Sequence, residues 1–178
     1  MIKKIVSVSA LLLLTSTVAF ATSAPYLGFG AGVLSNSAKS NNYRGLSGSL
    51  LAGWGGDINE SFYLAGELGA TLDSIQLNDN SGVGVKNLGT TYSYGLSLLP
   101  GFVISNHTKI FARLGAVRTR FNDIGQTSTG GELGLGLQTS ITQNWDLRGE
   151  YDWIGYSKVG GFSPNSDQFN LSLLYKFA

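Results

Sequence analysis

The feature that most constrains this chain is an alternation of apolar and polar side chains with a period of two residues. It recurs in eight segments of roughly ten residues each, which is the length of a strand that crosses a bilayer. The segments lie near residues 27–33, 46–54, 62–72, 92–103, 109–119, 132–141, 145–153 and 169–177. Because successive side chains of a strand point to opposite faces, each segment predicts a β-strand with one apolar and one polar face.

The number and order of these segments predict the fold class. Eight is an even number, as single-chain bacterial membrane barrels require, and only turns and loops are expected between the segments. We therefore expect an all-β fold, an eight-stranded antiparallel up-and-down transmembrane β-barrel. Beyond the N-terminal segment no apolar run is long enough for a membrane-spanning helix, because runs such as 98–104 are interrupted by Pro100 and Gly101.

The first 21 residues differ from the rest and predict a cleavable secretory signal peptide. Two lysines are followed by an apolar run and by the small-residue element Ala19-Phe20-Ala21, which favours cleavage after residue 21; cleavage after Ala24 is the alternative. Residues 22–178 then form one barrel domain. An uncleaved anchor is less favoured, because the apolar run is shorter than the roughly 20 residues of a spanning helix.

Composition narrows the remaining classes of protein. Charged residues make up 13% of the chain, against roughly 25% in a typical soluble domain, and glycine occurs 25 times. There is no cysteine, so stability must come from a closed sheet and its packing rather than from disulfides. Without the two lysines of the signal, acidic residues outnumber basic ones by one, which argues against nucleic acid as a partner.

The lengths of the connecting segments predict the orientation in the membrane. Short periplasmic turns and long extracellular loops are typical of outer-membrane barrels. We expect short links near 55–61, 105–108 and 142–144, and long ones near 35–44, 73–90, 120–130 and 155–167. The four long loops are rich in Ser, Asn and Gly and are where contact with a host or the environment is expected.

A soluble barrel is the structural alternative, because the same alternation would then place the apolar face in the core and the charged face in water. The aromatic residues favour the membrane barrel, whose outward aromatics gather at the two membrane interfaces. At the short-link end we expect Trp54, Phe62, Phe102, Trp145, Tyr175 and Phe177. At the long-loop end we expect Tyr92, Tyr94, Tyr151, Trp153 and Phe169.

Several motifs, taken in their order and spacing, make nearly all of the expected barrel domain similar to a known family. They are Gly53-Trp54-Gly55-Gly56, Leu99-Pro100-Gly101-Phe102, Arg113-Leu114-Gly115-Ala116, Asn144-Trp145-Asp146-Leu147-Arg148-Gly149-Glu150-Tyr151 and Leu173-Leu174-Tyr175-Lys176-Phe177. The chain resembles the small eight-stranded outer-membrane barrels of the OmpA, OmpX and opacity-protein type. The resemblance implies the outer membrane of a Gram-negative bacterium, with membrane lipid and lipopolysaccharide as partners.

The resemblance also gives the C-terminus a role in assembly. In this family, alternating aromatic residues at the end of the chain are the signal that the barrel-assembly machinery binds, and Tyr175 and Phe177 stand in those positions. This chain departs from the pattern because Ala178 follows the last aromatic residue.

Charged residues on the expected inward faces are candidates for an interior ion-pair cluster. The alternation places four charged side chains on the inward face at a similar depth in the membrane: Glu67, Arg113, Arg148 and Glu150. An ionised group in a narrow barrel must be paired or hydrated. The resemblance implies a lumen filled with such pairs, with Glu132 as a further member. Two interpretations remain open: a static plug, which we favour because buried ion pairs are common structural devices, and a gate.

Arg118 and Arg120 stand at the expected extracellular end of the fifth segment, and the alternation places both side chains on the outward face. At that level they face the head groups of the outer leaflet, where an arginine can bind the phosphates of lipopolysaccharide. Two solvated loop arginines are an equally open interpretation.

The residues give no support for catalysis, a cofactor or a metal site. His107 is the only histidine, and it is expected in a periplasmic turn, far from the outer leaflet that lipid-modifying barrels act on. Asp73, Asp79 and Asp123 are scattered over expected loops, where solvation explains them. We therefore expect a structural or surface-interaction protein; a narrow or gated channel is the alternative, and an outer-leaflet lipid-modifying enzyme is less favoured.

Pro100 carries a separate expectation. It has no N–H to donate to a neighbouring strand, and a closed barrel offers no free edge at which a proline is tolerated. We expect a bulge, or the end of regular pairing, near the short-link rim.

Overall fold

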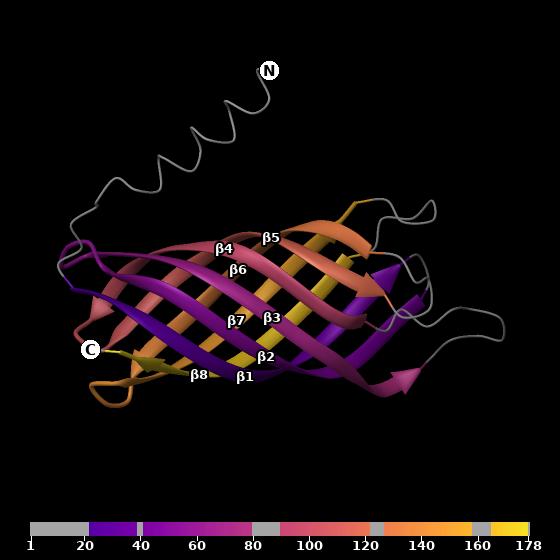
Figure 1. Ribbon diagram of the computed structural model, residues 1–178, viewed down its shortest axis with the longest axis horizontal. Helices are drawn as coiled ribbons and strands as arrows, with labels where there is room; N and C mark the ends of the chain where they lie inside the picture. The colour runs from indigo at the N-terminus through magenta and orange to yellow at the C-terminus, as the bar shows by residue number, and fades with distance from the viewer. Residues whose placement is uncertain (1–21, 39–40, 80–89, 122–126, 158–164, 178) are drawn as a thin grey trace, which may run out of the picture.

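Eight β-strands make up the regular structure of the described part of this protein. The computed structural model describes residues 22–38, 41–79, 90–121, 127–157 and 165–177, and Figure 1 shows their strands wound into one barrel. The strands are β1 (Thr22–Ala38), β2 (Asn41–Asp57), β3 (Phe62–Asp79), β4 (Thr90–Ser105), β5 (Thr108–Phe121), β6 (Thr127–Ser140), β7 (Trp145–Tyr156) and β8 (Asn165–Lys176). In these ranges no helix is long and apolar enough to span a membrane.

The strands close into a sheet in which each one pairs with the next. Every pairing is antiparallel, and β1 pairs with both β2 and β8, so the sheet has no free edge. Gly30, for example, lies opposite Ser49 of β2 and Ser172 of β8. The predicted all-β, eight-stranded antiparallel barrel is confirmed, whereas the predicted signal peptide, residues 1–21, lies outside the described residues.

The barrel wall is apolar outside and polar inside, the reverse of a soluble protein. Twenty-eight large apolar side chains of the described residues are exposed, among them Leu96 and Leu135 on the outer face, whereas eleven apolar residues are buried. The charged Glu67, Arg113 and Arg148 lie in the lumen with no more than 4% of their surface exposed. This polarity decides against the soluble barrel, whose charged face would be in water.

Outward aromatic residues lie near both ends of the strands, as the sequence predicts. At the short-turn end the Phe62 and Phe102 rings have centroids 5.1 Å apart, and the Tyr175 ring packs edge-on against both Trp145 and Phe177 at 5.0 Å. At the long-connector end Tyr92 and Tyr94 are stacked with centroids 6.4 Å apart. Such aromatic girdles are typical of the two interfaces of a membrane barrel.

The lumen is narrow enough to require glycine at several inward positions. A Cβ atom on Gly30 would lie 2.3 Å from Ser172 Oγ, and one on Gly136 would lie 2.2 Å from the ring of Phe111. Real Cβ atoms do not approach other atoms so closely. Inward glycines therefore make room for larger side chains that reach across the barrel.

The strands extend further than the alternation predicts. The expected long loop 35–44 is mostly strand, because pairing of β1 with β2 continues to Ala38 opposite Asn41. The other long connectors are shortened, since β3 continues to Asp79 and β5 to Phe121. The reason is physical: backbone pairing persists where the outward face no longer meets hydrocarbon, so the apolar alternation ends before the strand does.

The expectation for Pro100 holds on one side of the strand only. β4 continues to Ser105, pairing with β3 runs without a break through Leu64 opposite Pro100, and no bulge occurs there. Pairing with β5 lapses at Leu99 and Pro100, because proline has no N–H, and resumes in the same register at Gly101. The closed sheet holds the strand in place on both sides of this lapse.

The inverted polarity predicts how the barrel responds to charge on its outer face. Leu96 lies near the middle of β4 with 60% of its surface exposed, so Leu96→Arg should cost about 2–4 kcal/mol of unfolding free energy in a bilayer. Thr129→Arg, outward near the end of β6, should cost no more than about 1 kcal/mol. Urea unfolding in phospholipid vesicles measures both, and equal small losses would contradict the membrane position of β4.

Candidate functional site

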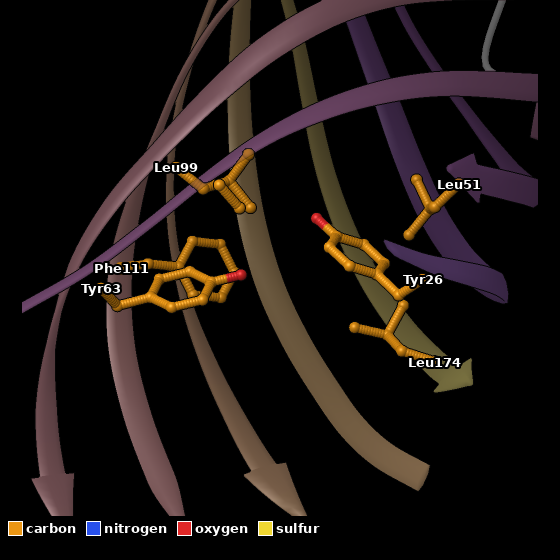
Figure 2. Packing of buried hydrophobic residues seen from close by; sticks show 7 residues of the cluster. Tyr26, Leu51, Tyr63, Leu99, Phe111 and Leu174 are labelled. Atoms are coloured by element: carbon orange, nitrogen blue, oxygen red, sulfur yellow. The ribbon is translucent and has the colours of Figure 1, made fainter. Parts of the chain in front are cut away.

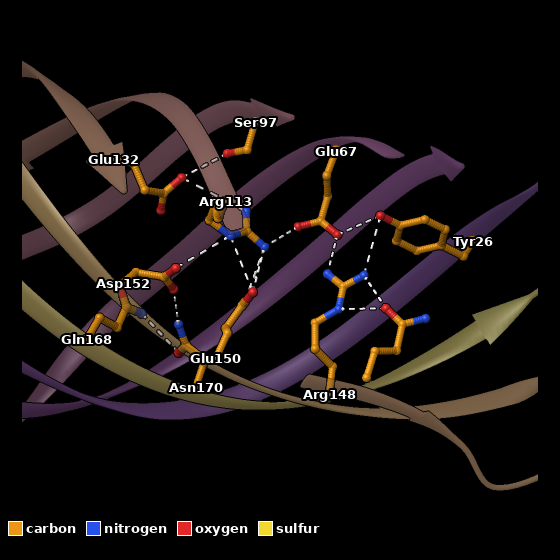
Figure 3. A network of polar contacts seen from close by, with 11 residues as sticks. Tyr26, Glu67, Ser97, Arg113, Glu132, Arg148, Glu150, Asp152, Gln168 and Asn170 are labelled. Atoms are coloured by element: carbon orange, nitrogen blue, oxygen red, sulfur yellow. Dashed lines mark hydrogen bonds and ion pairs between the residues drawn. The ribbon is translucent and has the colours of Figure 1, made fainter. Parts of the chain in front are cut away.

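The candidate site is a polar network inside the barrel, formed by side chains that reach across the lumen (Figure 3). Glu67 comes from β3, Arg113 from β5, Glu132 from β6, and Arg148 and Glu150 from β7. Each stands at an inward position of its strand, where the two-residue period places every second side chain. The structure brings all five residues together, and four of them are at most 4% exposed.

Glu67 lies between the two arginines. Its Oε1 accepts a hydrogen bond from Arg113 Nη2 at 2.5 Å, and its Oε2 accepts one from Arg148 Nη1 at 2.5 Å. Oε2 also accepts a hydrogen bond from the hydroxyl of Tyr26 at 2.8 Å. One carboxylate therefore ties β3 to β5, β7 and β1, none of which is paired with β3 in the sheet.

Arg148 is completely buried and has partners on every side. Gln138 Oε1 accepts hydrogen bonds from its Nε at 3.1 Å and its Nη2 at 2.9 Å. The guanidinium carbon lies 5.0 Å from the centroid of the Phe111 ring and 5.4 Å from that of Tyr26. A cation without water is tolerated here because a carboxylate, an amide oxygen and two ring faces replace its hydration.

Arg113 is the centre of the second half of the network. Its Nη2 donates to Glu150 Oε2 at 2.9 Å, and its Nε and Nη1 form longer ion pairs with Asp152 at 3.6 Å and Glu132 at 3.9 Å. Glu132 is held from the other side by Ser97, whose hydroxyl donates to it at 2.8 Å. Arg113 thus joins carboxylates from three strands.

Carboxylates outnumber guanidinium groups in this network. The charges of Glu67, Arg113, Arg148 and Glu150 sum to zero. Glu132 and Asp152 add two further carboxylates. Both line a cavity of about 40 Å³ beside Arg113 and Glu150, which has room for on the order of three water molecules. Asp152 Oδ1 has no hydrogen-bond partner among the described residues, so this side of the network is suited to hydration.

The network continues to the short-turn rim. Gln138 Nε2 donates to Asp146 Oδ2 at 2.6 Å, and Asp146 Oδ1 is 2.8 Å from Lys176 Nζ. A separate pair, Lys109 with Asp57, lies 2.6 Å apart at the same rim, where both side chains are partly exposed. The interior charges are therefore paired over the whole distance from mid-barrel to this end.

Apolar side chains fill the lumen on both sides of the charged layer. Figure 2 shows the larger cluster, which lies toward the short-turn end and consists of Tyr26, Leu51, Tyr63, Ala65, Leu99, Phe111 and Leu174. Toward the long-connector end a smaller cluster is formed by Val117, Ile154 and Tyr156. The interior is thus layered rather than uniformly polar.

Sequence reasoning missed several members of this interior. Tyr26, Gln138 and Asp152 stand at inward positions, so their phase could have assigned them to the network. Leu99 and Phe111 gave no such signal, because an apolar residue at an inward position only weakens the alternation from which the strands are predicted.

The remaining predicted residues lie outside the network. Arg118 and Arg120 are exposed on the outer face near the end of β5, and Tyr175 and Phe177 are exposed at the short-turn end. His107 is exposed in the turn between β4 and β5. In the ranges described above, no group of three or more His, Cys, Asp and Glu side chains could hold a metal ion.

The expectation that the three scattered aspartates lie in loops is wrong for two of them. Asp73 and Asp79 belong to β3 and not to a loop, because the strand is longer than the alternation predicts. Asp123 lies outside the described residues.

The family model for the outer membrane protein beta-barrel domain matches residues 7–177. The chain belongs to this family. It is therefore a barrel of the Gram-negative outer membrane, as the motifs and the polarity of the wall predict. A comparison with curated protein sequences gives no match.

Solved structures of small outer-membrane barrels are similar in fold. Neisserial surface protein A (NspA) is 22% identical with a TM-score of 0.62, over 88% of this chain and 99% of NspA. Ail, the attachment invasion locus protein of Yersinia pestis, is 18% identical with a TM-score of 0.54, over 86% of this chain and 99% of Ail. Ail is also known in complex with the heparin analogue sucrose octasulfate. At these identities the likeness concerns the fold alone.

The geometry of Glu67 and Arg148 predicts strong coupling between them. Arg148→Met should cost about 3–5 kcal/mol of unfolding free energy, because it leaves a buried carboxylate with one cation fewer. Combining it with Glu67→Gln should cost less than the sum of the single losses. Urea unfolding in vesicles of the single and double variants gives the coupling energy.

The rim pair of Lys109 and Asp57 is the matched control for this cycle. Its two side chains are 19% and 29% exposed, so Lys109→Met and Asp57→Asn should be coupled by no more than about 1 kcal/mol. Additive losses for Glu67 and Arg148 would show that the two groups are hydrated separately.

Proposed function

We propose that this protein is a non-catalytic surface barrel with a closed lumen, which acts through its outer face and its extracellular strand ends. The filled interior is the observation that carries the proposal. Ion pairs occupy the middle of the barrel, and apolar clusters lie on both sides of them. A lumen occupied in this way leaves the outside of the molecule as the surface available for function.

The small size of the interior cavities supports the static plug over the channel. Two cavities of the described interior have volumes of about 40 and 30 Å³, each enough for on the order of two or three water molecules. Arg113 and Glu132 line the first of them, so movement of these charged groups would be needed before an ion could pass. We therefore interpret the cluster as a device that replaces a hydrophobic core.

The proposed orientation places the long connectors outside the cell. The short turns join β2 to β3, β4 to β5 and β6 to β7, and the family pattern puts such turns in the periplasm. The strand ends at Ala38, Asp79, Phe121 and Tyr156 are then extracellular. Host or environmental ligands would be met at this end.

The outer face of the barrel near the long-connector end is suited to binding lipopolysaccharide. Arg118 and Arg120 are exposed there, two residues apart on one face of β5, about 7 Å between their Cα atoms. They lie directly opposite Tyr94 and Tyr92 of β4, whose stacked rings are suited to the membrane interface. Two guanidinium groups above an aromatic interface match the phosphates of the outer-leaflet head groups.

Two other partners follow from family membership and chemistry. Tyr175 and Phe177 present exposed aromatic rings at the end of β8, which supports recognition of the C-terminus by the barrel-assembly machinery. Exposed arginines would also suit a polyanionic surface ligand, and sucrose octasulfate, bound by Ail, has that chemistry. A lipid-modifying activity has no comparable support, since His107 lies at the opposite end from the outer leaflet.

The arginine pair predicts salt-sensitive binding of lipopolysaccharide. Replacing Arg118 and Arg120 together by Ala should weaken binding of purified lipopolysaccharide to the reconstituted barrel roughly tenfold, the value expected for two exposed charge pairs. The difference should shrink at high salt, because exposed charges are screened.

Arg44→Ala is the control, because Arg44 is exposed near the same end of β2 but has no arginine two residues away. Adhesion of cells that express the wild type or the Arg118 and Arg120 variant, in a strain without its own copy, tests the wider surface role. Unchanged lipopolysaccharide affinity in the double variant would rule out lipopolysaccharide as a ligand of this arginine pair. Unchanged adhesion on deleting the protein would rule out the proposed role at the cell surface.

A further inference from the structure

We propose that an apolar groove in the outer wall of the barrel, near the short-turn end, binds one acyl chain of a membrane phospholipid in a fixed position. The groove crosses β3, β4 and β5 and has a volume of about 650 Å³. Leu64, Phe102, Ile110 and Leu135 surround it, and Pro100 and Ala112 form its floor. This inference depends on the barrel being in a membrane and not on its role at the cell surface.

The sequence explains why the wall is hollow at this place. Pro100 and Ala112 are small or compact residues on the outward face, surrounded by leucine, isoleucine and phenylalanine on the adjacent rows. Behind them Gly101 stands at an inward position with no side chain, and Phe111 and Tyr63 on either side of it also contribute to the lining. The lapse in pairing between β4 and β5 falls at the same place.

The chemistry of the groove fits a hydrocarbon chain. Its lining is almost entirely apolar, and it continues the outer surface that hydrocarbon already contacts, because Phe102 and Ile110 are 56% and 42% exposed. A flexible chain gains dispersion contacts in a concave apolar site that it does not make on a convex wall. These contacts favour one bound chain over the freely exchanging lipid around it.

One end of the groove suits the polar part of the same lipid. Asn59, in the turn between β2 and β3, is among the lining residues. Its Oδ1 accepts hydrogen bonds from the backbone N–H groups of Ser61 and Phe62, both at 2.9 Å, which fixes the direction of the side chain. The amide Nδ2 has no partner among the described residues and can donate to an ester or phosphate oxygen.

The test uses wild-type protein in symmetric vesicles of phosphatidylethanolamine and phosphatidylglycerol that contain a phospholipid with a photoactivatable acyl chain. Mapping the adducts by mass spectrometry should give several-fold more label on Phe102, Ile110 and Leu135 than on Trp145 and Tyr175, which lie in the same aromatic belt on other strands. Even labelling around the belt would overturn the proposal. Symmetric vesicles make this result independent of orientation and of any surface ligand.

A pair of variants on one strand tests the floor of the groove. Ala112→Phe should fill it and reduce the label on Phe102 and Leu135 several-fold, whereas Ala116→Phe, on the same outward face of β5 but outside the groove, should leave the label unchanged. Equal labelling in both variants would contradict the site. With a photoactivatable residue in place of Ile110 and unlabelled lipid, cross-links to a second copy of the chain, in place of lipid adducts, would assign the groove to a protein interface and also overturn the proposal.

Discussion

Glu67 holds two arginines together in the middle of the barrel, and the remaining interior is arranged around that contact. Its two carboxylate oxygens each accept a hydrogen bond of 2.5 Å, one from Arg113 and one from Arg148. Charges in so dry a space are tolerated only when they are paired and their other hydrogen bonds are satisfied. Tyr26 and Gln138 supply those bonds, and the apolar clusters keep the bulk solvent away.

Each strand of this protein must satisfy two different environments at once. Its outward side chains meet hydrocarbon, and its inward side chains share a lumen so narrow that Gly30 and Gly136 cannot carry a Cβ atom. The two faces influence each other around Pro100 and Gly101, where compact residues on both sides of the wall leave a groove on the outside. Closure of the sheet makes this local weakness tolerable, because neighbouring strands keep their register.

The strands, their number and the direction of their faces could be predicted because a two-residue period is a local signal. The same phase located Glu67, Arg113, Arg148 and Glu150 on the inside, but it could not show which of them touch, since that depends on stagger and depth around the barrel. Leu99 and Phe111 were not predictable in this way, because an apolar inward residue resembles a defect in the alternation.

Strand ends were predicted least well, for a related reason. The alternation reports on contact with hydrocarbon, whereas pairing of β1 with β2 continues beyond that contact to Ala38. The effect of Pro100 was predicted only in part, because the rule for proline considers one strand and its missing N–H. In a closed barrel the pairing on the other side of the strand, with β3, decides whether the strand continues.

A lumen closed by ion pairs and apolar clusters does not conduct ions. The most direct test is to record ionic current through planar phospholipid bilayers that contain the reconstituted wild-type barrel, with an open porin of larger strand number as a positive control. We expect no stepwise conductance for this protein under conditions in which the porin gives clear steps. Discrete conductance steps from the folded wild-type barrel would contradict it and would make the charged cluster a gate.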